Sequence, residues 1–310
     1  MRHFLDLSDF SRTELQGMLN LAIRMKDEWR HGGNDPLLEG QVLAMIFQKP
    51  SLRTRVSFDM AMRHLGGDAL YLSPDEIGLG QREAISDVSQ VVSRYVDAVM
   101  ARVFAHDHIL ELARHASVPV INGLSDFNHP CQAMADMLTV LERFGQLEGL
   151  KLAFVGDGNN VAVSLLYACA RLGVDYTIST PEGYELPSKA VAVAQELAQD
   201  SGAEIRQLHD PGEAVQAAHV IYTDTWVSMG DEAEANERRQ VFTPYQVNQE
   251  LVSSADSSAI VMHCLPAHRG EEITNEVAEG PHSVIFQQAE NRMHAQKAIL
   301  VTLLAPDTVE

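Results

Sequence analysis

The sequence predicts an α/β fold made of two doubly wound parallel-sheet domains with a cleft between them. Three observations lead to this prediction. Short apolar runs alternate with helical patterns along the whole chain, as in parallel strands that are joined by helices. The length of 310 residues suits about two domains of ordinary size. A hydrophobic content of 45% against 21% charged residues allows each domain to bury a core.

The first half of the chain is predicted to contain four strands separated by helices. Ser11, followed by Glu14 three residues later, forms a capping-box signature that starts the first helix. A second helix is expected from about Arg53 to Gly66-Gly67. The remaining predicted elements are strands 42–47, 69–72, 96–102 and 118–122, and helices 85–95 and 109–115. This series predicts a parallel sheet that is covered on both faces.

A helical pattern at 133–144 leads into a second series of the same kind. Its strand candidates are 151–155, 176–180, 204–208, 220–223, 260–263 and 284–286, and a final helix is expected at about 291–304. The charged stretch 231–239 has no apolar periodicity, so we expect an exposed loop there. We expect the first domain at 1–140, joined by the C-terminal helix at about 291–310, and the second domain at 141–290.

Charge and cysteine content exclude several classes of protein. A formal net charge of −20 argues against a nucleic-acid surface or an anionic membrane partner. The three cysteines are an odd number without CxxC spacing, which argues against a disulfide framework and a structural zinc site. No apolar run is long enough to span a bilayer, and the N-terminus lacks an apolar signal core. We therefore expect a cytoplasmic protein.

Unusual polar residues follow the predicted strands at their carboxyl ends, where open α/β sheets bind ligands. These residues are Ser51–Arg55, Arg102 and His129–Gln132 in the first half, and Gly156–Asn160, Asp224 and His263-Cys264 in the second. Taken singly, Arg102 could be a surface charge and His129 a satisfied loop histidine. Their convergence on one edge in each half favours a ligand site.

Ser51–Arg55 lies between a strand and a helix, where free backbone N–H groups and the helix dipole suit a phosphate. Hydroxyl groups add donors there, and arginine adds a bidentate fork. The alternative interpretation is a helix cap beside two solvated arginines, and this segment alone does not decide between them. The loop Gly156–Asn160 is not GxGxxG, so it is a weak nucleotide signal, and Asn159 and Asn160 could simply cap a helix. Cys169 lies among leucines and alanines and is expected in the core, whereas Cys264 follows a strand in a polar setting.

The combined motifs resemble the carbamoyltransferase family, and most closely its ornithine-specific members. The family carries an S-x-R-T-R segment, an H-P-x-Q segment and an H-C-L-P segment, which here are Ser51–Arg55, His129–Gln132 and His263–Pro266. The resemblance extends through Asp224–Gly230 and Glu290–Lys297, so it covers nearly the whole chain. It implies carbamoyl transfer from carbamoyl phosphate to the side-chain amine of L-ornithine in an active-site cleft between the domains. It implies no cofactor and no metal.

The resemblance also implies roles for individual residues. The expected carbamoyl phosphate ligands are Ser51, Leu52, Arg53, Thr54, Arg102, His129, Pro130, Cys131, Gln132, Cys264, Leu265 and Arg292. The expected ornithine ligands are Asn160, Asp224, Ser228 and Met229. Arg102, His129 and Cys264 are the expected catalytic residues. Family members are usually homotrimers, so a homotrimer or a multiple of trimers is expected.

Two departures from the family pattern leave alternatives open. Leu52 stands where ornithine enzymes usually have Thr or Gly, which slightly favours an acceptor such as N-acylated ornithine or putrescine. Gly78 stands where the family supplies a Gln to a neighbouring subunit, and Gln81 lies three residues later. This departure leaves open the alternative that the chain is a non-catalytic relative of the family. The loop Gly156–Asn160 keeps a nucleotide-dependent oxidoreductase as an alternative of a different class. The sequence does not separate a biosynthetic from a catabolic enzyme.

Overall fold

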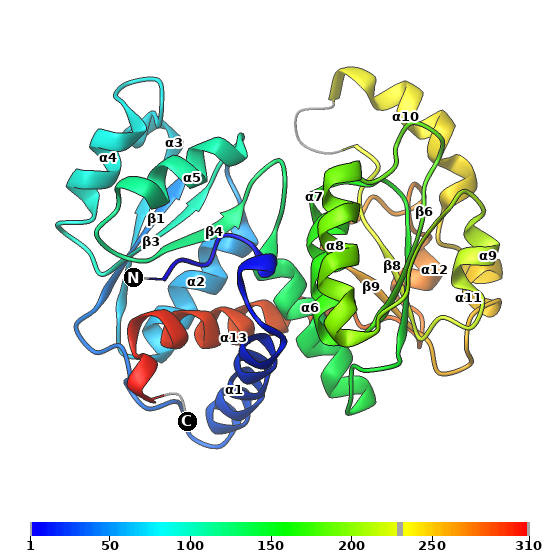
Figure 1. The fold of residues 1–310 in the computed structure, drawn as a ribbon, viewed down its shortest axis with the longest axis horizontal. Helices are drawn as coiled ribbons and strands as arrows, with labels where there is room; N and C mark the ends of the chain where they lie inside the picture. The colour runs from blue at the N-terminus through cyan, green and yellow to red at the C-terminus, as the bar shows by residue number, and fades with distance from the viewer. Residues whose placement is uncertain (1, 228–231, 309–310) are drawn as a thin grey trace. The chain divides into compact units, whose positions relative to one another are not determined.

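The computed structural model describes residues 2–227 and 232–308, and the chain divides into two compact units. Unit one comprises residues 1–138 and 291–310, and unit two comprises residues 139–290. Each unit is built on its own parallel sheet, which confirms the predicted fold class of two α/β domains (Figure 1). No helix in the described ranges is both long and apolar enough to cross a membrane.

Unit one contains a four-stranded sheet in the order β2-β1-β3-β4, with every neighbouring pair parallel. The strands are β1 (Val42–Phe47), β2 (Asp68–Leu72), β3 (Ala98–Arg102) and β4 (Val120–Leu124). All residues of β3 and β4 are buried, as expected for strands that are covered on both faces. Because the chain leaves β1 toward β2 and later returns to β3 on its other side, the sheet has its switch point between β1 and β3.

The helices of unit one cover both faces of this sheet. They are α1 (Arg12–Arg30), α2 (Leu52–His64), α3 (Pro74–Ile77), α4 (Ile85–Val92), α5 (His106–His115), the first part of α6 (Pro130–Phe144) and most of α13 (Ile285–Leu304). Figure 1 shows α4 and α5 on one face, and α2 with α13 on the other. The predicted capping box is confirmed, because Ser11 and Glu14 exchange hydrogen bonds at the start of α1.

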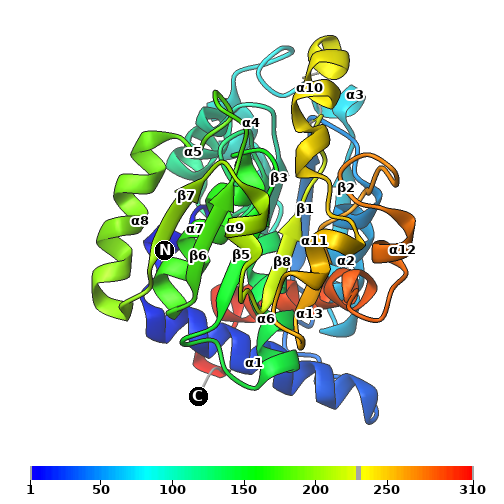
Figure 2. The same cartoon turned by 90° about the vertical axis from the view of Figure 1, so that its right-hand side faces the viewer.

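Unit two contains a five-stranded parallel sheet in the order β7-β6-β5-β8-β9, of which Figure 2 labels β7, β6, β5 and β8. The strands are β5 (Lys151–Val155), β6 (Asp175–Ser179), β7 (Ile205–Leu208), β8 (Val220–Thr223) and β9 (Ile260–His263). The helices are α7 (Asn160–Leu172), α8 (Ser188–Ser201), α9 (Pro211–Val215), α10 (Ala235–Phe242), α11 (Gln249–Ser253) and α12 (Asn275–Ala278). Its switch point lies between β5 and β8.

One predicted strand is the start of a helix, and several other elements differ from the prediction in extent. Helix α6 begins at Pro130 and not at 133, because proline suits the first helical position, where no N–H is needed. The predicted strand at 284–286 opens helix α13, and the chain meets β9 only in an isolated bridge between Val261 and Ser283. A short apolar run does not distinguish a strand from a helix start.

The charged stretch 231–239 is exposed at most of its described residues, as expected, but it is helical and not a loop. Glu232–Glu234 form a 3-10 turn, and helix α10 starts at Ala235. The helix lacks apolar periodicity at this point because it buries a charge. Arg238 is only 7% exposed and forms an ion pair with Asp157.

Candidate active site

The switch point of the sheet in unit one brings the first set of predicted residues together. Arg102, the last residue of β3, pairs in register with Phe47, the last residue of β1. The backbone N–H of Gln48 donates to the Arg102 carbonyl at 2.9 Å. The chain then turns through Lys49 and Pro50 to Ser51. The Arg102 side chain and the Ser51 segment therefore start from the same edge of the sheet.

Ser51 caps helix α2, and Thr54 lies at the centre of the local hydrogen bonds. The Ser51 hydroxyl accepts from the Thr54 N–H and donates to Thr54 Oγ1 at 3.0 Å. Arg292 of α13 donates from Nη2 to the same Thr54 oxygen at 2.9 Å. Thr54 is fully buried and Arg292 is 4% exposed. An arginine from the end of the chain is thus held against the N-terminus of α2, where backbone N–H groups and the helix dipole favour an anion.

His129 lies in a positively charged environment. Its side chain is buried, and burial is the main reason why its pKa lies well below the ordinary value. The positive charges of Arg292, Arg102 and Lys49 lower the pKa of His129 further. Each of these three cations is at most 9% exposed. His129 is therefore a neutral imidazole at neutral pH, and the surrounding charges form a field that suits a phosphate.

The residues after His129 occupy the first turn of α6. The Gln132 N–H donates to the His129 carbonyl at 3.0 Å, which keeps both residues at the same helix end. Pro130 has no N–H to offer. The buried Cys131 thiol points into the unit and donates to the Asn122 carbonyl at 3.4 Å, and burial raises its pKa to about 12. The Cys131 side chain is therefore a core group, and only its backbone is available to a ligand.

The side chains of Leu52, Arg53 and Arg55 differ in their exposure to solvent. The Leu52 side chain is 76% exposed, so it does not crowd the site of its own unit. Arg53 is half-buried, whereas Arg55 is exposed and lies over the Tyr71 ring at 4.0 Å. Arg55 therefore contributes to a surface contact, while Arg53 stays a predicted phosphate ligand.

Gly78 has a conformational reason for being glycine. It ends helix α3 with φ of 50°, and a Cβ placed there would approach the Arg82 Cβ to 2.9 Å. A glutamine at this position would require the turn to shift. Gln81 is exposed in the next turn, and its N–H donates to the Gly78 carbonyl at 2.8 Å. Glycine at position 78 is thus required by the shape of this turn.

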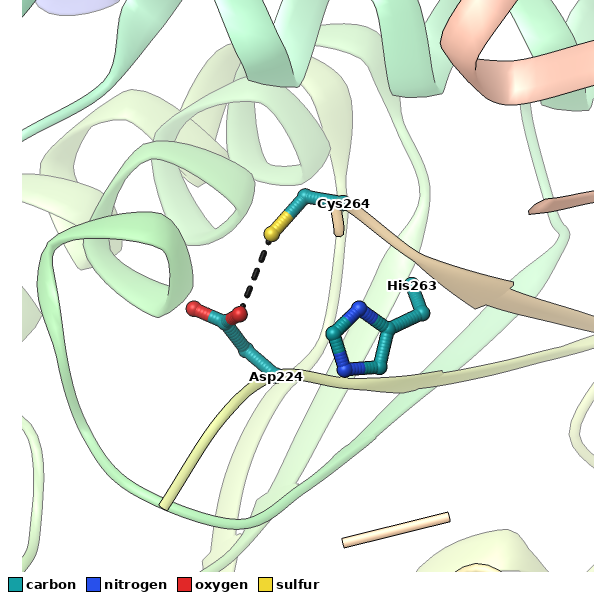
Figure 3. Close-up of side chains that lie close together, drawn as sticks. All are labelled: Asp224, His263 and Cys264. Atoms are coloured by element: carbon teal, nitrogen blue, oxygen red, sulfur yellow. Dashed lines mark hydrogen bonds between the residues drawn. The ribbon is translucent and has the colours of Figure 1, made fainter. Parts of the chain in front are cut away.

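In unit two, the predicted residues gather at the switch point between β5 and β8. The loop 156–160 follows β5, Asp224 follows β8, and Cys264 follows β9. Thr223 pairs in register with His263, so the residues that follow them leave the sheet side by side. The Cys264 thiol donates to Asp224 Oδ1 at 3.1 Å (Figure 3).

Asn159 completes this arrangement, and its second role was not predicted. Its side-chain oxygen caps α7 by accepting from the N–H groups of Val161 and Ala162. Its amide nitrogen donates to Asp224 Oδ2 at 2.9 Å. The two oxygens of Asp224 are therefore fixed from opposite sides, by Asn159 and by Cys264. The adjacent Asn160, a predicted ornithine ligand, is the first residue of α7 and is half-buried.

His263 supports the backbone that carries Cys264. The His263 ring and Glu272 are both fully buried, and His263 Nε2 lies 3.0 Å from Glu272 Oε1. The Leu265 N–H donates to His263 Nδ1 at 2.9 Å. Leu265 has φ of 61°, a left-handed conformation that costs a leucine roughly 1 to 3 kcal/mol. The ring thus holds the turn that directs the Cys264 thiol toward Asp224.

Asp224, His263 and Cys264 have ligand atoms within 4.8 Å of one another, which is the spacing of a metal site. However, both ring nitrogens of His263 are already hydrogen-bonded, to Glu272 and to the Leu265 N–H. A metal ion would have to break one of these bonds. The arrangement suits orientation of an amine and transfer of its proton better than it suits a cation.

Sequence reasoning also missed the ion pair between Arg238 and Asp157 beside this site. Arg238 Nη2 lies 2.9 Å from Asp157 Oδ2, and the Arg238 guanidinium lies 4.9 Å from the Tyr184 ring centroid. The aspartate two residues before Asn159 is a signal that could have suggested such a partner. Ser228 and Met229, the other predicted ornithine ligands, lie outside the described residues.

Comparisons with known proteins agree for both units. Residues 2–142 match the model of the aspartate/ornithine carbamoyltransferase carbamoyl-P binding domain. Residues 148–303 match the Asp/Orn binding domain of the same family. The chain is 54% identical to the ornithine carbamoyltransferase of Pyrococcus horikoshii over 303 residues, which are 98% of this chain and 96% of that protein. It is also 54% identical, with the same coverage, to the anabolic ornithine carbamoyltransferase of Pyrococcus furiosus.

Solved structures show the same likeness. The ornithine carbamoyltransferase of Pyrococcus furiosus superposes with a TM-score of 0.96 at 53% identity, covering 98% of this chain and 97% of that one. The anabolic ornithine carbamoyltransferase of Campylobacter jejuni gives a TM-score of 0.93 at 39% identity, covering 98% and 99%. Sequence and fold thus resemble the same group of proteins over nearly their full length.

Proposed function

The chain belongs to the aspartate/ornithine carbamoyltransferase family, and we propose that it transfers the carbamoyl group of carbamoyl phosphate to the side-chain amine of L-ornithine. The products are L-citrulline and phosphate. The observation that carries this proposal is the presence of two complementary half-sites in one chain. Unit one has buried cations around the neutral His129. Unit two has a thiol–carboxylate pair, Cys264 and Asp224, at the carboxyl ends of β9 and β8.

The donor half-site is assigned to unit one. Ser51, the Leu52 N–H, Arg53 and Thr54 bind the phosphate at the N-terminus of α2. Arg102, His129 and Thr54 donate to the carbamoyl oxygen, and Arg292 contributes positive charge. These roles are supported by the burial of the cations and by the contact of Arg292 with Thr54. A dianionic substrate needs such a local field, because the chain as a whole carries a net charge of −20.

The acceptor half-site is assigned to unit two. Asn160, Asp224, Ser228 and Met229 bind the amino-acid end of ornithine, and Cys264 meets the side-chain amine. Because the thiol proton of Cys264 is directed at Asp224, we assign its sulfur as the acceptor for an N–H of the amine. Accepting one N–H orients the nitrogen lone pair toward the carbonyl carbon.

The reaction forms a C–N bond, breaks a C–O bond and removes one proton from the attacking nitrogen. The neutral amine attacks the carbamoyl carbon, and Arg102, His129 and Thr54 stabilise the charge that develops on the carbonyl oxygen. The C–O bond to phosphate then breaks, and the proton lost by the nitrogen passes to the Cys264 sulfur as the thiol gives its own proton to Asp224. The phosphate leaves as an anion in the field of the arginines. Phosphate is a good leaving group, so orientation and oxyanion stabilisation supply most of the catalysis.

Assembly and location are part of the proposal. The chain forms a homotrimer, or a multiple of trimers, in the cytoplasm. An apolar stripe supports association: Leu52, Val56 and Met60 follow one another at helical spacing on α2, with exposed fractions of 76%, 49% and 37%. Leu70, on the edge strand β2, is 50% exposed. Exposed apolar groups beside an unpaired sheet edge are typical of a subunit interface.

The other acceptors, N-acylated ornithine and putrescine, are not favoured. The outward position of Leu52 removes the feature that had argued for them. A nucleotide-dependent oxidoreductase is not favoured either, because Asn159 in the glycine-rich loop is used to cap α7 and to fix Asp224.

Product analysis tests the proposed function. Incubation with carbamoyl phosphate and L-ornithine should release citrulline and phosphate in equal amounts, and Asp224→Ala should release neither above the rate of spontaneous hydrolysis. Phosphate release without citrulline would contradict the proposal.

A further inference from the structure

The side chain of Gln132 has a fixed partner one helical turn away. Gln132 Nε2 donates to Asp136 Oδ1 at 2.8 Å, and both residues lie on α6. Gln132 is 1% exposed and Asp136 is fully buried. Their contact is therefore a hydrogen bond shielded from water, where the low local dielectric strengthens it.

This contact determines which end of the Gln132 amide faces away from Asp136. A carboxylate only accepts hydrogen bonds, so the NH2 group of Gln132 must face Asp136. The Gln132 carbonyl oxygen then points away from Asp136, and it has no hydrogen-bond partner among the described residues. A buried acceptor without a partner destabilises the fold, so its presence calls for a donor from a ligand.

We propose that Asp136 is a positioning residue that gives the enzyme its selectivity for a carbamoyl group. Asp136 holds Gln132 so that its carbonyl oxygen accepts from the carbamoyl NH2. This inference rests on the proposed function, which assigns the carbamoyl group to the site at His129. Gln132 lies beside His129 in the first turn of α6. Without Asp136, the amide can rotate by half a turn and present its NH2 group instead.

The selectivity for carbamoyl phosphate over acetyl phosphate follows from the N–H groups that acetyl phosphate lacks. A methyl group is close to NH2 in size, so shape alone separates acetyl phosphate from carbamoyl phosphate poorly. A methyl group cannot donate to the Gln132 oxygen and leaves it buried and unpaired. Sites built around such a hydrogen bond reject the analogue that lacks it far more strongly than apolar pockets reject one methylene.

Two stable analogues isolate this effect. Phosphonoacetamide carries the NH2 group, and 2-oxopropylphosphonate carries a methyl group in its place. Their dissociation constants are measured by calorimetry for the unmodified enzyme and for Asp136→Ala, Asp136→Leu and Asp136→Asn. The Leu variant keeps most of the volume but offers no acceptor, which guards against collapse of the Ala variant. The Asn variant retains a carbonyl oxygen that can accept from Gln132. Met137→Leu, at a buried position on the same helix, is the matched control.

The unmodified enzyme should bind phosphonoacetamide at least tenfold more tightly than 2-oxopropylphosphonate. Asp136→Ala and Asp136→Leu should bring this ratio to within about twofold of unity, with the affinity for 2-oxopropylphosphonate changed less than threefold. Asp136→Asn should restore most of the ratio, and Met137→Leu should leave it intact. An unchanged ratio in the Ala and Leu variants, or equal weakening of both analogues, would overturn the role of Asp136. Failure of the unmodified enzyme to bind either analogue would instead contradict the carbamoyl phosphate site itself.

Discussion

The thiol of Cys264 donates a hydrogen bond to the carboxylate of Asp224 over 3.1 Å. The two residues follow neighbouring strands, β9 and β8, so the parallel sheet itself brings them together. Asn159 holds the other carboxylate oxygen, and the ring of His263 holds the turn after Cys264. The thiol therefore has a defined orientation before any substrate binds.

Replacement of the Cys264 side chain should lower kcat/KM for ornithine more than kcat/KM for carbamoyl phosphate. Cys264→Ala removes the group that meets the ornithine amine, and kcat/KM for ornithine should fall about 100-fold. Cys264→Ser keeps a proton donor for Asp224 and should lose less than tenfold. Steady-state kinetics with each substrate varied in turn provide the measurement. Equal losses in the two variants would show that the hydrogen bond to Asp224 is unimportant.

Arg55 provides a control for the prediction that Arg53 binds the phosphate. They carry the same charge two residues apart, but only Arg53 is half-buried, while Arg55 lies over Tyr71. Arg53→Ala should weaken phosphonoacetamide binding at least 100-fold, because a charge-assisted contact to the phosphonate is lost. Arg55→Ala should weaken it less than threefold. Similar effects of the two substitutions in calorimetry would reduce the role of Arg53 to a general charge effect.

The acceptor amine should dominate the dependence of activity on pH. An amine of this kind has a pKa of about 10.4, so at pH 8 only roughly one molecule in 250 is neutral. The value of kcat/KM for ornithine should rise from pH 6 to about pH 9, close to tenfold for each pH unit. His129 is neutral over this range, because burial and its cationic neighbours lower its pKa. A flat profile, with chemistry limiting, would contradict attack by the neutral amine.

The buried His129 should also make the fold less stable in acid. Its pKa is lowered in the folded chain, so below about pH 6.5 the unfolded chain takes up a proton that the folded chain does not. The free energy of unfolding should therefore fall as the pH drops below that value, by up to about 1.4 kcal/mol per pH unit from this one group. His129→Gln should show a weaker decline in denaturation midpoint between pH 6.5 and pH 5. Parallel declines in both proteins would contradict the burial of a neutral His129.

Most strands were predictable, because a buried parallel strand is a short apolar run that ends in polar residues. Strands 42–47, 151–155, 220–223 and 260–263 have the predicted bounds. The run 284–286 has the same composition, yet it opens α13, since apolar content alone does not separate a strand from a helix start. Helix α10 was missed because it buries Arg238 against Asp157, and an ion pair leaves no apolar periodicity.

Motifs indicated most of the site, but not the contacts that orient it. Asp224 and Cys264 were expected, whereas the second role of Asn159 was hidden because a helix-capping residue looks the same in sequence. Asp136 lies four residues after Gln132 on one helix, and this spacing alone does not reveal that its partner is an amide with a ligand-facing oxygen. Such contacts depend on burial, which a single sequence does not provide.

The choice of acceptor amine tests the proposed function directly. Citrulline or ureido-product formation from carbamoyl phosphate should be compared for L-ornithine, N-acetyl-L-ornithine and putrescine under identical conditions. We predict that kcat/KM for L-ornithine exceeds that for each of the other amines by at least 100-fold, because only ornithine offers both a free α-amino group and an α-carboxylate. A value for N-acetyl-L-ornithine or putrescine equal to or above that for L-ornithine would contradict the account.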